Sequence, residues 1–130
     1  EFSLYDYYGD VIVLDFSTMW CGYCNVAAQT VQEHQDKYGP NGFQYVTVLI
    51  EDHQGGSVSE SEAQMWADAY GITTAPILIG DRSLIDPSAV SGYPITGWPT
   101  FVIINRDMVI TSGISGWSEQ AIVLAIESSL

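Results

Sequence analysis

The sequence predicts an α/β domain in which a central mixed β-sheet is flanked by helices. Two observations lead to this fold class. Two apolar, β-branched runs at residues 11–16 and 43–50 are separated by a segment of helical periodicity, a pattern typical of parallel strands joined by a helix. Two further runs, 99–105 and 108–114, are separated by a short polar turn and precede a last helical segment, which indicates an antiparallel hairpin.

Composition sets limits on the class of protein. The chain has 130 residues, which we interpret as a single domain, 1–130, and its 47% apolar and 15% charged content argues against disorder. Its apolar runs are too short to cross a bilayer, so we expect no membrane insertion of this segment. The chain has sixteen acidic residues and only three basic ones, Lys37, Arg82 and Arg106. The resulting net charge of −13 disfavours nucleic acid as a partner.

The first half of the chain supplies two strands and one helix. The run at 11–16 is apolar enough for a strand buried on both faces, and 43–50 is a second buried strand. Residues 25–40 read as a helix of about four turns that stops at Gly39-Pro40. The inner stripe of this helix is expected to contain Val26, Ala27, Thr30, Val31 and His34 or Gln35.

The middle of the chain is a polar loop, a helix and an irregular insert. Ser59 and Glu62 have the spacing of a capping box, and the helix that follows is expected to end at Gly71. Residues 72–97 form the insert, which contains a short apolar stretch, ILIG, and a possible single helical turn at 86–90.

The end of the chain is a hairpin followed by a helix. Arg106 and Asp107 lie near the turn of the hairpin, and Ser118 is placed to cap the last helix. One face of that helix carries Ile122, Ala125, Ile126 and Leu130.

The two cysteines are the main candidates for catalytic residues in this sequence. Cys21 and Cys24 stand three residues apart, directly after the first strand and at the start of the helix. The first turn of a helix has unpartnered N–H groups that stabilise a thiolate at Cys21. Cys24, one turn on, lies on the same face and can attack a mixed disulfide. The pair therefore predicts two-electron thiol–disulfide exchange.

Three other interpretations of the cysteine pair are weaker. A zinc site needs two more ligands, but His34 lies about 15 Å along the same helix and His53 has no partner at ligand spacing. A structural disulfide within one helical turn constrains almost none of the unfolded chain. A c-type haem site needs histidine after Cys24, where Asn25 stands. We therefore expect no metal and no cofactor beyond the redox-active Cys21–Cys24 disulfide.

The segment LDFSTMWCGYC, in which Trp20 precedes the cysteines, resembles the signature of the thioredoxin superfamily. The resemblance implies the thioredoxin fold, and it implies that Asp15 is buried beneath the cysteines and relays a proton to and from Cys24. A carboxyl in apolar surroundings has a raised pKa, which suits this role. The alternative places Asp15 on the solvent face of an edge strand, but its neighbours are Leu14 and Phe16.

A second motif, GWPTFVII at residues 97–104, resembles the strand that a cis-proline opens beside the cysteines of this superfamily. The resemblance implies that Pro99 aligns an extended substrate and that its neighbours offer hydrogen bonds to the substrate backbone. Proline is tolerated at the first residue of a strand. Pro76 is the rival candidate, but it lacks the Pro-Thr-Phe pattern.

Within the superfamily, the chain is most similar to the TlpA/ResA-like extracytoplasmic branch. The insert 72–97, before the cis-proline strand, stands where that branch carries its central insertion. Residues 25–28, Asn-Val-Ala-Ala, depart from the basic residue and glutamate usual there, and Ser17 and Thr18 replace the usual aromatic and small residues. The N-terminal hairpin of the branch is absent or trimmed.

Exposed groups around the cysteines are candidates for contacts with substrate. Trp20, Tyr23 and Trp98 make an aromatic surface suited to an extended chain, although aromatic residues of this kind also serve as ordinary core. Gly22 and Thr100 complete the expected substrate-binding set. The Gly-Tyr dipeptide also occurs between the cysteines of some periplasmic disulfide isomerases.

We expect a reductase that acts on protein disulfides and draws electrons from an upstream dithiol donor. No cation lies near the cysteines in sequence to stabilise a strongly oxidising thiolate. A disulfide isomerase or oxidase, a redox-idle binding module and a peroxiredoxin-like peroxidase remain alternatives, although the peroxidase needs an arginine near its thiol. We expect a monomer. Because the chain starts at Glu1 and is acidic, we expect a processed protein that is periplasmic or exported, with the cytoplasm as the alternative.

Overall fold

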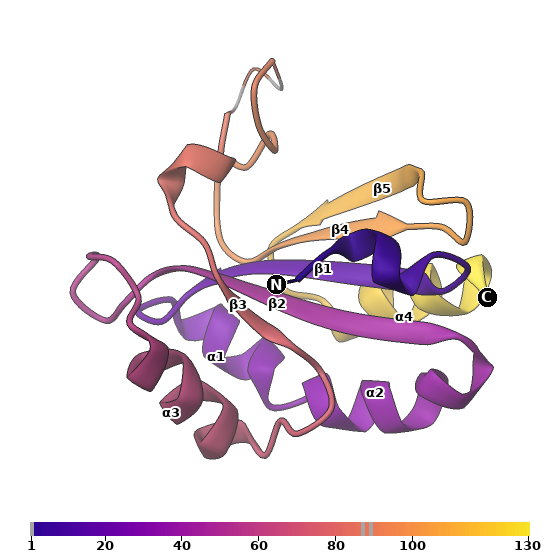
Figure 1. The fold of residues 1–130 in the computed structure, drawn as a ribbon, viewed down its shortest axis with the longest axis horizontal. Helices are drawn as coiled ribbons and strands as arrows, with labels where there is room; N and C mark the ends of the chain where they lie inside the picture. The colour runs from indigo at the N-terminus through magenta and orange to yellow at the C-terminus, as the bar shows by residue number, and fades with distance from the viewer. Residues whose placement is uncertain (1, 87, 89) are drawn as a thin grey trace.

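A mixed sheet organises the computed structural model, which describes residues 2–86, 88 and 90–130 (Figure 1). The strands of these residues lie in the order β3-β2-β1-β4-β5. They are β1 (Val11–Thr18), β2 (Phe43–Glu51), β3 (Ile77–Ile79), β4 (Thr100–Ile104) and β5 (Ile110–Ser115). β1 and β3 are parallel to β2, whereas β4 is antiparallel to both β1 and β5. The predicted mixed sheet, with its parallel pair and C-terminal hairpin, is confirmed.

β1 is the central strand of the sheet, and every residue from Val11 to Thr18 is buried. Its apolar run is continuous because both of its faces are covered. Asp15 lies opposite Thr47 of β2 on one side and Phe101 of β4 on the other. Asp15 is therefore in the middle of the sheet, and its alternative placement on an exposed edge strand is wrong.

Four α-helices of the described chain lie on one face of the sheet. They are α1 (Gly22–Ala28), α2 (Val31–Tyr38), α3 (Glu60–Tyr70) and α4 (Glu119–Ser129). The other face, formed by alternate residues such as Ile12, Leu14 and Phe16, packs against the N-terminal segment with its 3-10 helix η1 (Leu4–Tyr7) and against the insert. The sheet expected to be flanked by helices thus has the four described α-helices on one face and a short 3-10 helix on the other.

The helix expected at 25–40 is two helices. α1 ends at Ala28 and α2 begins at Val31, and in between the N–H groups of Gln29 and Thr30 bond to carbonyls three residues back. The Thr30 hydroxyl also donates to the carbonyl of Ala27 at 2.8 Å, a side-chain bond that competes with the helical pattern.

The break changes which side chains of this segment face the core. Val26, expected inside, is 40% exposed, whereas Ala27 and Val31 are buried as expected. His34 and Gln35, offered as alternatives for the inner stripe, are both buried.

The helix caps predicted from the sequence are present in the structure. Ser59 and Glu62 form the reciprocal capping box, and Gly71 ends α3 in the left-handed conformation with φ of 64°. Ser118 caps α4 by accepting a hydrogen bond from the N–H of Ala121 at 3.2 Å. These features depend on neighbours within one helical turn, which is why the sequence predicts them.

The insert is an extended excursion with little regular structure. It contains β3, the 3-10 helix η3 (Arg82–Leu84) and an isolated parallel bridge between Ile85 and Tyr93. The helical turn expected at 86–90 includes Pro87 and Ala89, which lie outside the described residues. None of the helices in the described ranges has both the length and the apolar character needed to span a membrane.

Candidate active site

The two cysteines lie where β1 gives way to α1. Cys21 is the N-cap of α1, with extended backbone angles, and its Sγ accepts a hydrogen bond from the N–H of Cys24 at 3.2 Å. This bond gives one unpartnered N–H of the first turn an acceptor, and it favours negative charge on the Cys21 sulfur. Both side chains are free thiols in this structure.

The two thiols differ in access. Cys21 is 7% exposed and Cys24 is fully buried at 0%. The turn that carries them is open to solvent, because Gly22 is exposed and Tyr23 is 66% exposed. A visiting sulfur therefore reaches Cys21 first, and Cys24 lies behind it.

Asp15 lies in the buried layer beneath the cysteines. Side chains alternate along β1, so Asp15 and Ser17 face the same side of the sheet, toward the cluster that contains Cys24. The Ser17 hydroxyl donates to Asp15 Oδ1 at 2.5 Å, and the Tyr45 hydroxyl of β2 donates to Asp15 Oδ2 at 2.6 Å. Burial raises the pKa of Asp15 to about 6, although both hydroxyls act to lower it.

Cys24 is held in its protonated form by its surroundings. Burial is the largest cause that raises the pKa of its thiol, followed by the hydrogen bond with Cys21. Hydrogen bonds from the Thr18 backbone and the Ser17 side chain oppose this rise, and the charge of Asp15 adds to it. Cys24 therefore needs a base before it can act as a nucleophile, and Asp15 titrates in the range where a base is useful.

Pro99 lies at the start of β4, next to the end of β1. The Trp98–Pro99 peptide bond is cis, and Thr100 lies opposite Phe16 in the β1–β4 register. Both Pro99 and Thr100 are buried, and the Thr100 hydroxyl donates to the carbonyl of Gly97 at 2.8 Å. Pro76, the rival candidate, precedes β3 at the edge of the sheet.

The aromatic residues flank the cysteines with different degrees of exposure. Trp20 is 47% exposed, and its indole N–H donates to Glu51 Oε1 at 2.8 Å. Trp98 is half-buried and packs against the apolar clusters on both faces of the sheet. The expected aromatic surface is thus formed mainly by Trp20 and Tyr23, with Trp98 partly inside.

Glu51 is a site residue that the sequence did not indicate. Its carboxylate bonds to Trp20 through Oε1 and to the Arg82 guanidinium through Oε2 at 2.6 Å. These bonds, the one from Arg82 first, lower the pKa of Glu51. The insert thereby brings one of the few cations of the chain close to the cysteine turn, but with its charge paired by Glu51.

Asn25 fixes the turn from the other side. Its side-chain amide donates to the carbonyls of Met19 at 3.2 Å and Cys21 at 2.7 Å, and its Oδ1 accepts from the Tyr70 hydroxyl of α3. Asn25 stands where the similar branch usually carries a basic residue. Here it holds the backbone on both sides of Trp20.

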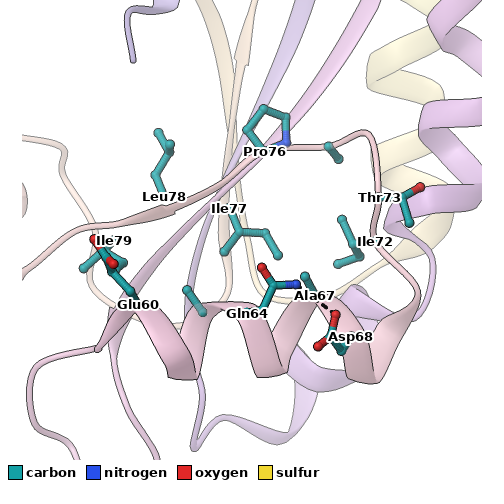
Figure 2. Close-up of a pocket in the computed structure, with 12 residues that line it drawn as sticks. Glu60, Gln64, Ala67, Asp68, Ile72, Thr73, Pro76, Ile77, Leu78 and Ile79 are labelled. Carbon is teal, nitrogen blue, oxygen red and sulfur yellow. Dashed lines mark hydrogen bonds between the residues drawn. The ribbon is translucent and has the colours of Figure 1, made fainter. Parts of the chain in front are cut away.

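Two hollows lie near α3. The smaller, about 190 Å³, adjoins the cysteine turn and is lined by Met19, Asn25, His53, Met65, Trp66, Ala69 and Tyr70. The larger, about 680 Å³, lies between α3 and the segment 72–79 (Figure 2). Figure 2 shows Gln64 and Asp68 on the helix side, where Gln64 donates to Asp68 at 2.9 Å. No residue of the cysteine turn lines this larger hollow.

Within residues 2–86, 88 and 90–130, no group of three or more His, Cys, Asp or Glu side chains is placed to hold a metal ion. The buried polar groups on this face of β1 are the Asp15 carboxyl and the Ser17 hydroxyl.

Comparison with known proteins identifies a family. Residues 1–112 match the model of the AhpC/TSA family. A stretch of 51 residues is 31% identical to a thioredoxin from Coprinus comatus and covers 39% of this chain and 48% of that protein. The chain thus spans about half the length of this curated relative.

Solved structures share the fold. A thiol:disulfide interchange protein of the thioredoxin family from Chlorobium tepidum TLS superposes with a TM-score of 0.79 at 20% identity, over 98% of this chain and 85% of that one. A DsbF homologue from Corynebacterium diphtheriae gives 0.76 at 22% identity, over 98% and 76%. The exposed lipoprotein thioredoxin Etrx1 of Streptococcus pneumoniae gives 0.69 at 23% identity, over 95% and 87%.

These comparisons agree on the fold of the chain. The mixed sheet is that of the thioredoxin fold. The match to the AhpC/TSA family model confirms the resemblance to the thioredoxin superfamily. The family model extends over most of the sequence, from the first residue to the middle of β5. The chain belongs to the AhpC/TSA family.

Proposed function

We propose that this protein is a thiol–disulfide oxidoreductase that exchanges its Cys21–Cys24 pair with the cystines of other proteins, in the reducing direction. The observation that carries the proposal is the arrangement of three groups in depth. Cys21 is at the rim, Cys24 is buried one helical turn behind it, and Asp15 lies in the layer below with a pKa of about 6. Residues 1–130 act as one thioredoxin-like domain, and the redox group is the cysteine pair itself.

The reaction proceeds in two displacements. The Cys21 thiolate attacks one sulfur of a substrate disulfide, and the other substrate sulfur leaves with the bonding electron pair. Cys24 then loses its proton, and its sulfur attacks Cys21 Sγ and releases the second substrate sulfur as a thiolate. The substrate gains two electrons and the protein ends as the Cys21–Cys24 disulfide. Asp15 accepts the proton of Cys24 and returns it when an upstream dithiol reduces the pair.

Pro99 and the aromatic residues position the substrate in this proposal. Pro99 stands at the start of β4, beside the strand that leads into Cys21. Trp20 and Tyr23 offer exposed rings next to an exposed glycine, Gly22, so an extended chain can approach without a steric barrier. Thr100 acts through the backbone here, because its hydroxyl is buried and bonded to Gly97.

We base the proposed reducing direction on the charges near Cys21. A strongly oxidising pair needs a well-stabilised thiolate, usually beside a cation. Arg82 reaches this region, but Glu51 pairs its charge. We therefore expect a reduction potential closer to that of thioredoxin, roughly −270 mV, than to that of DsbA, roughly −120 mV.

We base the proposed location and partners on proteins of similar fold and on the charge of the chain. Structures of similar fold include a secreted disulfide oxidoreductase of Mycobacterium tuberculosis and an exposed lipoprotein of Streptococcus pneumoniae. We propose that this protein also works outside the cytoplasm, as a monomer. Its electrons then come from an upstream dithiol protein.

A two-part experiment tests the proposal. The wild type should reduce a model protein disulfide catalytically with a dithiol as donor, and equilibration with glutathione buffers should give its potential. A Cys24→Ser variant should accumulate a mixed disulfide on Cys21. Absence of both turnover and trapped adduct would overturn the proposal in favour of a redox-idle binding module, and a potential near that of DsbA would favour an oxidase.

The family match makes a peroxidase the second candidate. The peroxide-reactive thiol of such a peroxidase needs a nearby arginine with an unpaired guanidinium. Arg82 is bonded to Glu51, and Arg106 donates to the backbone carbonyls of Gly9 at 3.0 Å and Asn41 at 2.9 Å. We therefore expect slow oxidation of the thiols by hydrogen peroxide, and fast peroxide turnover in the same assay would favour the peroxidase.

A further inference from the structure

β3 is an edge strand of the sheet, and its outer side presents backbone groups to solvent. Directly after the strand, the Gly80 N–H donates to the Leu49 carbonyl of β2 at 2.9 Å. Because the backbone groups of successive residues in a strand turn to opposite sides, the N–H and C=O of Leu78 also face β2. Those of Ile77 and Ile79 face outward, where the described residues give them no hydrogen-bond partner. This edge can therefore pair with one more strand.

The larger hollow, of about 680 Å³, lies along this edge, between β3 and α3 (Figure 2). Its strand side is apolar and includes Ile77 and Ile79, the latter 45% exposed. Its helix side carries Glu60, Gln64 and Asp68, which are exposed and stand four residues apart on one face of α3. Figure 2 shows Glu60 beside Ile79 and Asp68 at the other end of this row.

The charge of the larger hollow indicates which kind of chain fits it. Glu60 and Asp68 are the charged residues of its lining, which contains no Lys, Arg or His. Gln64 donates to Asp68 at 2.9 Å, but no cation pairs with either carboxylate within the described residues. A second copy of this chain has a net charge of −13 and is repelled, whereas a basic segment of another protein is attracted.

The spacing of the two carboxylates predicts the pattern of that segment. Glu60 and Asp68 are eight residues apart on α3, which is about 12 Å at 1.5 Å per residue. In an extended strand, residues four apart lie on one face at a separation of about 13 Å. Basic side chains at positions i and i+4 therefore match the two carboxylates. An apolar side chain at i+2 then faces the alanine and isoleucine lining between them.

We propose that the larger hollow and the outer edge of β3 form a docking site for a basic, extended segment of a partner protein. The segment adds to the sheet as a further strand, and its backbone pairs with Ile77 and Ile79. Its lysine or arginine side chains at i and i+4 contact Glu60 and Asp68. The site goes beyond the proposed exchange function, because no residue of the cysteine turn lines it.

Fluorescence anisotropy with two labelled peptides tests the charge of the site. One peptide contains the order Lys-Thr-Val-Thr-Lys, and the other has glutamate in place of both lysines. We expect the wild type to bind the basic peptide saturably and more weakly as salt is added, and to bind the acidic peptide at least about tenfold more weakly. Equal binding of the two peptides would overturn the proposal.

Single variants locate the charge effect. Glu60→Gln and Asp68→Asn should each weaken binding of the basic peptide by about two- to fivefold, the range of an exposed ion pair. Glu33→Gln is the matched control, because it removes an exposed carboxylate from α2, outside the larger hollow. Binding that responds equally to all three variants would reflect the net charge of the protein, and it would contradict a specific site.

Amide hydrogen exchange, followed by NMR with and without the basic peptide, tests the strand edge. Exchange of the Ile77 and Ile79 amides should slow in the complex, whereas the Leu78 amide faces β2 and should change little. Ile79→Pro removes an outward N–H but no bond to β2, and it should weaken binding by about tenfold. If circular dichroism shows that this variant does not fold, the exchange measurement decides. Unchanged exchange at both isoleucines with saturating peptide would overturn the proposal.

Analytical ultracentrifugation separates a partner protein from a second copy of the chain. The wild type should sediment as a monomer, and a dimer that Ile79→Pro dissociates would show that the edge pairs with another copy, which would overturn the proposal. Absent peptide binding together with normal disulfide turnover would refute this inference alone. Absent turnover together with normal peptide binding would refute the exchange function alone.

Discussion

Replacing Asp15 by asparagine should stabilise the protein at neutral pH while it slows catalysis. Burial raises the pKa of Asp15 from 3.8 to about 6, so its ionisation costs about 3 kcal/mol more in the folded protein than in the unfolded chain. Between these two values the folded state binds more protons than the unfolded state. The free energy of unfolding of the wild type therefore falls as the pH rises from about 4 to about 6, and the loss is complete above that range.

The magnitude for Asp15→Asn follows from this cost. Asparagine carries no charge and still accepts one of the hydrogen bonds from Ser17 and Tyr45, so we expect a gain of about 2–3 kcal/mol at pH 8. At pH 4 the wild-type carboxyl is protonated in the folded state, and the gain should shrink to under about 1 kcal/mol. Against a typical total stability of about 5–15 kcal/mol, the difference is large.

Urea unfolding of both proteins, with both cysteines kept reduced, measures this difference at pH 4 and pH 8. Taking the difference between variants cancels the titration of the other carboxylates. The same variant should resolve the mixed disulfide more slowly, because it has no base for Cys24. An equal stability difference at the two pH values would refute the reasoning, since it would mean that Asp15 does not titrate abnormally.

Three further predictions concern single contacts. Tyr45→Phe removes a hydrogen bond that favours the Asp15 carboxylate, so the pH above which Cys24 resolves a mixed disulfide at its full rate should move upward; single-turnover reaction with glutathione disulfide, quenched with acid and analysed by mass spectrometry, measures this rate. Ser59→Ala removes the capping box of α3 and should cost about 1 kcal/mol in urea unfolding, with little change in turnover. Trp20→Ala removes an exposed ring and its bond to Glu51, so it should raise KM for a protein disulfide more than it lowers kcat; the reverse split would exclude a docking role.

The sequence predicts those parts of the fold that depend on near neighbours. The capping box at Ser59, the cap at Ser118 and the hairpin of β4 and β5 all involve residues close in sequence, and each is present. The burial of Asp15 was also predictable, because a carboxyl inside a continuous apolar run has no exposed face available.

The network around Asp15 depends on distant contacts that no local pattern reveals. Tyr45 is thirty residues from Asp15, and Glu51 is thirty-one residues from both Trp20 and Arg82. At the break between α1 and α2, the Thr30 hydroxyl donates to the carbonyl of Ala27, a contact that the sequence pattern did not indicate. Ser17 had a local signal, its departure from the aromatic residue of similar sequences, but its hydrogen bond to Asp15 is seen only in the structure.

The inequivalence of the two sulfurs is the central claim of this account. Cys24→Ser and Cys21→Ser variants, each reacted with the same peptide disulfide at pH 7 and analysed by mass spectrometry, test it most directly. Because Cys21 is at the rim and Cys24 is buried, the first variant should form its adduct at least tenfold faster than the second. Equal rates, or faster reaction at Cys24, would contradict the assignment of Cys21 as the attacking thiol.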